Sequence, residues 1–138
     1  MTGLRSIGAV KDTTTLTVTD PRTGKPVLHG DGRPMTLTLH GPYSAVYKTL
    51  LRDQQQKRVE EAAGGPVAPL TQAETEATMN ALVRGCVAAW DLTLEGDEVP
   101  PCDPQTVDAV FTEFVWLYDQ CFAALGRVSD FFESPKTA

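Results

Sequence analysis

The sequence predicts an α+β fold in which a small N-terminal antiparallel β-hairpin sheet packs on a mainly helical part of three to four helices. Two patterns predict it. Residues 13–40 alternate apolar and polar side chains between turn residues, whereas later segments carry apolar side chains at helical spacings of three and four. With 138 residues, of which 41% are hydrophobic, the chain suits a single domain with one core, residues 1–138.

The predicted sheet covers residues 13–40 and follows a flexible lead-in at residues 1–12. Thr13–Thr19 is rich in β-branched residues, and Met35–Leu39 alternates in the same way. A short strand at Val27–Leu28 is expected between two turns that contain Pro and Gly. Because an isolated hairpin is only marginally stable in water, its apolar face should pack on the helices.

The helical part should contain a helix at 44–62 and a region at 71–133 with main helices near 71–92 and 104–125, followed by a tail at 134–138. Apolar side chains form a strong stripe along each of the last two helices. We expect four aromatic side chains of these helices to be buried together: Trp90, Phe111, Phe114 and Phe122.

Helix starts are marked by side chains that cap free backbone N–H groups. Ser44 can cap the first helix, and Thr71 with Glu74 matches a capping box for the second. Asp103 followed by Pro104 fits the start of the third helix, and Gly126 fits its end.

Charge is spread unevenly along this acidic chain, whose net charge is −6. Residues 1–69 carry nine Lys/Arg and six Asp/Glu, and residues 70–138 carry three and twelve, giving +3 and −9. Because affinity for nucleic acid depends on neutralising phosphates, no nucleic-acid partner is expected. The uneven charge permits head-to-tail self-association or docking of a basic partner on the C-terminal half. The alternative is two solvated surfaces that merely differ in charge.

The sequence offers no recognisable catalytic, cofactor-binding or metal-binding motif, so we expect no enzyme and no cofactor. The three cysteines are far apart in the sequence, so we expect free thiols at Cys86, Cys102 and Cys121. Cys86 and Cys121 fall on apolar helix faces. His29 and His40 fall at a turn and a strand end, where each could meet a carboxylate but is more often solvated. No apolar run approaches the roughly 18 residues of a membrane span, and no secretory signal is evident.

Trp116 does not fit the amphipathic pattern. On a continuous helix over residues 104–125 it would lie opposite the apolar stripe, beside Asp119. Such a Trp is covered either by another part of the chain or by another protein. The same two alternatives apply to Phe131 and Phe132, because aromatic anchors are favoured in protein–protein contacts. We therefore take Trp116, Asp119, Phe131 and Phe132 as candidate partner-binding residues.

The order of these segments resembles the tail assembly chaperones of siphophages, the bacteriophages with long, non-contractile tails. The resemblance runs from about residue 17 to 133 and is carried by a series of short motifs: Asp20–Pro26, Asp31–Leu37, Gly41–Ser44 with Tyr47, Trp90-Asp91 with a following Leu, Gly96–Pro100, Asp103–Thr106, Phe114–Gln120 and Phe131-Phe132. One departure is Cys102, where an aromatic residue or Ser is expected.

The resemblance implies a non-catalytic protein that binds the tape measure protein, and often the tail tube protein, during tail morphogenesis. It implies action in the cytoplasm of the infected bacterial host and absence from the mature virion. A tape measure protein is a long amphipathic helical chain that would aggregate with its apolar stripes exposed. The alternative is a minor structural protein of the virion tail or neck.

Members of this family are often made in two forms, the longer by a −1 ribosomal frameshift. Codons for Ser134-Pro135-Lys136 are compatible with a slippery heptamer, and so are those for Asp130-Phe131-Phe132. Any three residues have a high chance of being compatible with such a heptamer by coincidence. The alternative is that residues 134–138 are a plain polar tail.

Overall fold

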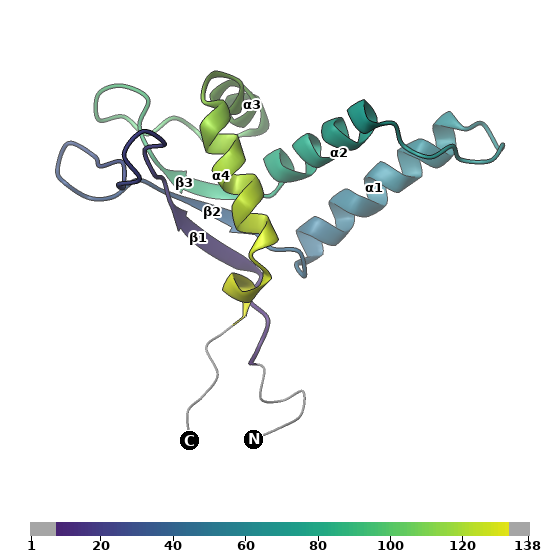
Figure 1. Cartoon of the computed structure of the whole chain (residues 1–138), viewed down its shortest axis with the longest axis horizontal. Helices are drawn as coiled ribbons and strands as arrows, with labels where there is room; N and C mark the ends of the chain where they lie inside the picture. Colours follow the sequence, from purple (N-terminus) through teal and green to yellow (C-terminus); the bar gives the residue numbers. More distant parts are fainter. Residues whose placement is uncertain (1–7, 133–138) are drawn as a thin grey trace.

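The computed structural model describes residues 8–132 and confirms an α+β fold (Figure 1). A three-stranded antiparallel sheet has the order β1-β2-β3, and four α-helices and a short 3₁₀ segment, Val128–Phe131, accompany it. Residues 134–136, the first of the two candidate slippery sites, lie outside the described part. Within residues 8–132, no helix combines the length and apolar character needed to cross a membrane.

The sheet is apolar on one face only. Its strands are β1 (Thr13–Thr17), β2 (Thr36–His40) and β3 (Val87–Asp91). Leu37 of β2 lies in register between Leu16 of β1 and Trp90 of β3, and all three side chains are buried. Thr15 and Thr38 pair on the opposite face, with their hydroxyl oxygens 3.2 Å apart. Alternation of buried Leu with Thr confirms the expected strands in residues 13–40.

The strand β3 corrects our predictions of one helix over residues 71–92 and of a sheet that covers only residues 13–40. The helix α2, Gln72–Gly85, ends early, and the chain turns at Cys86 into the strand. Gly85 weakens a helix, and Val87 and Trp90 favour a strand beside the open edge of β2. The backbone N–H of His40 donates to the Cys86 carbonyl at 2.7 Å, which joins the two segments. Sheet pairing therefore overrides the helical spacing.

The prediction of one continuous helix at 104–125 is also wrong, because the helix breaks at Phe114. The helices α3, Pro104–Glu113, and α4, Val115–Gly126, meet at this residue, whose φ of −112° and ψ of 72° are not helical. No Gly or Pro marks the break. The predicted start and end of this segment are confirmed. Asp103 accepts a hydrogen bond from the Thr106 N–H at 2.8 Å, and α4 ends at Gly126.

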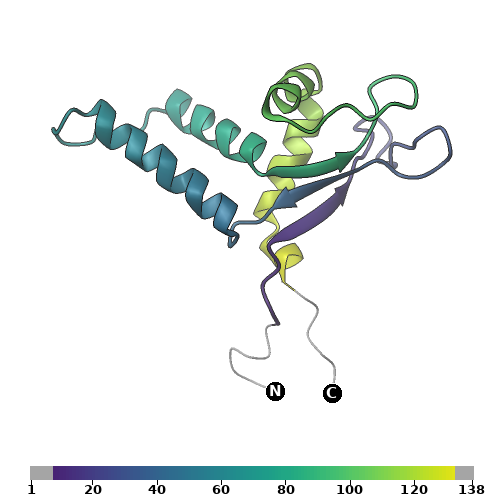
Figure 2. The same cartoon turned by 180° about the vertical axis from the view of Figure 1, so that it is seen from behind.

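The helices α3 and α4 cover the apolar face of the sheet, and the end of α2 lies beside them (Figure 2). The buried residues of these elements form one core. Its members are Leu16, Val18, Met35, Leu37, Leu39, Val83, Cys86, Trp90, Leu92, Val107, Val110, Phe111, Leu117, Cys121 and Ala124.

The helices α1, Ala45–Glu61, and α2 form an antiparallel arm that extends away from the sheet (Figures 1 and 2). The expected caps are present: Ser44 accepts from the Tyr47 N–H, and the capping box of Thr71 and Glu74 is complete. No residue of α1 is buried. The arm is joined to the core mainly through α2, whose Leu82 and Val83 are buried, whereas α1 only packs Tyr47 and Leu50 against the core.

Segments near the two ends of the described chain are joined. The N–H of Lys11 donates to the carbonyl of Phe131 at 2.6 Å, and Gly41 donates to the carbonyl of Asp12 at 2.7 Å. Lys11 and Asp12, the last two residues of the predicted flexible lead-in, are thus docked on the rest of the chain, and residues 1–7 lie outside the described part. A Cβ on Gly41 would overlap the Phe131 ring, so only Gly permits this close approach.

The aromatic residues expected in the core differ in burial. Phe111 and Trp90 are buried, and Phe114 is half-buried against the core. Phe122 is 46% exposed, which contradicts the prediction. The break at Phe114 rotates α4 relative to α3, so a helical stripe drawn across both does not stay on one face.

Replacing Phe111 with Ala should therefore lower the free energy of unfolding by about 3–5 kcal/mol, the usual cost of a large core cavity. Phe122→Ala removes the same side chain from an exposed site and serves as the matched control, with a cost below about 1 kcal/mol. Urea denaturation of both variants measures the difference. Equal losses would show that α4 packs with another face inward.

Candidate functional site

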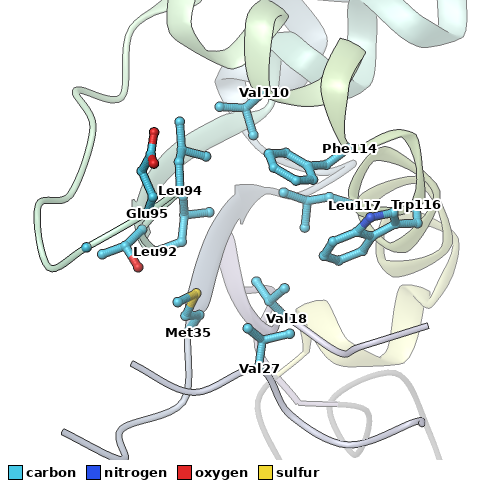
Figure 3. Close-up of a pocket in the computed structure, with 12 residues that line it drawn as sticks. Val18, Val27, Met35, Leu92, Leu94, Glu95, Val110, Phe114, Trp116 and Leu117 are labelled. Carbon is cyan, nitrogen blue, oxygen red and sulfur yellow. The ribbon is translucent and has the colours of Figure 1, made fainter. Parts of the chain in front are cut away.

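The candidate site is an apolar groove of about 270 Å³ beside the break between α3 and α4 (Figure 3). It has a floor from the hairpin region, one wall from α3 and α4, and another from the loop after β3. The residues that line it are Val18, Val27, Met35, Leu92, Thr93, Leu94, Glu95, Gly96, Val110, Phe114, Trp116 and Leu117.

The floor of the groove is held by backbone hydrogen bonds. Val18 donates to Met35 at 2.9 Å, Val27 to Val18 at 2.8 Å and Met35 to Val27 at 2.8 Å. Leu28 and Pro34 form an isolated bridge, and no strand is formed at 27–28, where a short strand was expected. Three chain segments thus present adjacent apolar side chains on a fixed backbone.

The helical wall depends on the break at Phe114. The rings of Phe114 and Trp116 meet edge to face, with centroids 5.9 Å apart and planes at 72°. Trp116 is half-buried and packs against the core, because the non-helical Phe114 redirects the chain. The helical wheel placed Trp116 opposite the apolar stripe by assuming one continuous helix. Trp116 is partly covered by its own chain, and it also lines the groove.

The loop wall is anchored at both ends. The indole N–H of Trp90 donates to the Pro100 carbonyl at 2.9 Å, and Leu92 is buried. Leu94 is 47% exposed and stands on the side of the groove opposite Phe114 and Trp116 (Figure 3). A large solvent-exposed aliphatic side chain beside an apolar groove is typical of a binding surface.

A polar corner supports the same loop. The buried His29 places Nε2 3.0 Å from the Asp91 carbonyl oxygen and 3.3 Å from its Oδ1. Arg33 donates to Asp91 at 3.0 Å and to Asp31 at 2.7 Å. His29 therefore meets a carboxylate, and the corner ties the second turn of the hairpin to the end of β3. Its chemistry is that of a structural ion-pair network.

The other predicted partner-binding residues do not line the groove. Asp119 is exposed on α4. Phe131 is fully buried beside Gly41, so its side chain serves packing within the chain. Phe132 is half-buried and meets Tyr43 edge to face at 5.7 Å between centroids. These two aromatic residues lie at the end of the molecule where residues 10–12 pair with the C-terminal segment.

Sequence reasoning missed the loop and floor of the groove. Leu92 and Leu94 are two aliphatic residues in a short acidic connection, a signal that was visible but open to several explanations. Val18, Val27 and Met35 belong to a hairpin whose apolar face was expected to be wholly covered. Only the position of the helix break shows that part of this face stays open.

Nucleophilic and metal-ligating groups do not gather in the described part. Among residues 8–132, no three His, Cys, Asp or Glu side chains lie close enough to hold a metal ion. Cys86 and Cys121 are buried, and burial raises the pKa of the first to about 11 and of the second to about 12. Both thiols are thus neutral at physiological pH.

Comparison with known proteins finds no matching family model, no matching curated protein and no matching solved structure.

The thiols make a chemical test of the packing. Cys102 is exposed and should react with Ellman's reagent in the native protein faster than the other two, although partial burial and Asp103 raise its pKa, whereas Cys86 and Cys121 should react only after unfolding. Because folding raises the pKa of both buried thiols, their contribution to stability is complete below the unfolded value, about 8.5, and is lost as the pH rises toward about 11 for Cys86 and about 12 for Cys121. More than one fast thiol in the native protein would contradict the burial described here.

Proposed function

We propose that this protein is a tail assembly chaperone of a siphophage and acts without catalysis by binding the tape measure protein during tail morphogenesis. The observation that carries the proposal is the open apolar groove with Trp116 and Leu94 on its opposite walls. Such a surface suits an apolar stripe of a long helical partner, which a helper must shield from aggregation.

The position of the resembling motifs supports the proposal. The motifs Asp20–Pro26 and Asp31–Leu37 flank the floor of the groove, and Gly96–Pro100 continues its loop wall. The motif Phe114–Gln120 forms the helical wall. Segments that are far apart in the sequence, and that carry the resemblance separately, therefore meet around one surface.

The size of the groove limits what it can do alone. About 270 Å³ is just below the usual range of small-molecule pockets and suits a few apolar side chains of a partner. The exposed Leu94 and half-buried Trp116 extend the apolar contact beyond the hollow itself. Large aromatic anchors of this kind often carry most of the binding free energy in protein complexes.

Trp116→Ala should sharply reduce co-purification with the tape measure protein encoded by the same phage and should increase the insoluble fraction of that partner. Trp116→Phe should keep part of the binding, because it retains the aromatic contact with Phe114. Pull-down after co-expression measures both effects.

Phe122→Ala is the control, because it also removes an aromatic side chain from α4 but lies outside the groove. Thermal unfolding of each variant, measured in parallel, separates lost docking from lost folding. Equal co-purification of the wild type and Trp116→Ala would contradict the groove as the docking site. Mass spectrometry of purified virions distinguishes the alternative, because a minor structural protein would be present in fixed copy number.

A further inference from the structure

The segment that builds most of the groove is strongly acidic. Residues 85–126 contain eight Asp/Glu and no Lys or Arg. Three of these acids, Glu95, Asp97 and Glu98, are exposed in the loop after β3, and Glu95 lines the groove itself. On the other wall, the exposed Glu113 immediately precedes Phe114.

The basic residues that adjoin this segment are already paired with acids of the same chain. Arg33 contacts Asp31 at 2.7 Å and Asp91 at 3.0 Å. Two further pairs are formed by Arg84 with Asp108, at 3.2 Å, and by Arg127 with Asp130, at 3.0 Å.

Of the four exposed acids, Glu95 lines the groove, whereas Asp97 lines a separate polar pocket with His29, Asp31 and Arg33. Within residues 8–132, Glu95, Asp97, Glu98 and Glu113 make no salt bridge. Glu95, Asp97 and Glu98 are close together in one short loop, and like charges so placed repel each other and create a negative potential that extends about a Debye length into solvent, roughly 8 Å at physiological salt. A ligand that brings positive charge would relieve this repulsion, and one that brings negative charge would increase it.

We infer that the groove selects a partner segment whose apolar anchors are flanked by Lys or Arg. This inference rests on the proposed function and specifies the chemistry of the segment that docks. In a helical partner, basic residues three or four positions from an apolar anchor lie on the same face. The anchor then enters between Leu94 and Trp116 while the cations face Glu95 and its neighbours.

The charge pattern also separates two roles of the site. Apolar contact with Trp116, Phe114 and Leu94 supplies affinity, and the acids supply discrimination and faster association. An apolar segment of the phage or host that carries acidic flanks is rejected by repulsion, which prevents the groove from binding any exposed hydrophobic stretch.

The test uses the full-length protein and three synthetic helical peptides of about 18 residues with identical apolar anchors. Their flanking positions carry Lys, Gln or Glu. Isothermal titration calorimetry should show the Lys peptide binding at least about tenfold more tightly than the Gln peptide at low salt, and the Glu peptide most weakly. The preference should largely disappear at about 0.5 M salt.

Neutralising the loop should remove most of the preference. The triple variant Glu95→Gln, Asp97→Asn and Glu98→Gln should bind the Lys and Gln peptides with similar affinity and melt close to the wild-type temperature. The matched control changes the same number of acids on the arm: Asp53→Asn, Glu60→Gln and Glu61→Gln. It should keep the preference.

The outcomes separate this inference from the proposed function. If the Lys and Gln peptides bind equally and independently of salt, and Trp116→Ala abolishes both, the groove docks a partner but the charge selection is wrong. If no peptide binds, the groove itself fails as the docking site. If light scattering shows that the protein self-associates and the triple variant is monomeric, a second copy occupies the groove, which also overturns the inference.

Discussion

Covering the single apolar face of the three-stranded sheet is the constraint on which the other elements depend. Leu16, Leu37 and Trp90 point to one side, whereas the opposite side is lined mainly by Thr. A five-residue strand spans about 17 Å. A straight helix over residues 104–126 would span about 35 Å and overhang such a sheet. The break at Phe114 lets α3 and α4 both contribute to one core with the sheet.

The groove follows from the same break. Two helices that meet at an angle over a small sheet leave a gap at their junction, and here the gap is lined by Phe114 and Trp116. The loop after β3 closes one side and is anchored by Trp90 and by the corner of His29 and Asp91. Rigid support on both sides means that the apolar surface is presented to a partner without a large ordering cost.

The sequence was most informative where local chemistry decides the structure. Alternation predicted β1 and β2, and capping residues predicted the starts of α1, α2 and α3. It failed where tertiary pairing decides, because residues 87–91 complete the edge of β2 instead of prolonging a helix. Phe114 carries no Gly or Pro signal, so the helical wheel could not give the true orientation of Trp116. The sequence singled out Trp116, which lines the groove, but not the loop residues Leu92 and Leu94 that line it too.

The central claim is that a partner docks between the loop after β3 and the junction of α3 and α4. It is tested most directly by site-specific photocrosslinking in the full-length protein co-expressed with the tape measure protein. A photoreactive amino acid at Leu94, on the groove wall, is compared with one at Thr15, on the exposed face of the sheet. The account predicts a crosslinked product from position 94 and none from position 15. A product from position 15 alone, while the two proteins still co-purify, would contradict it.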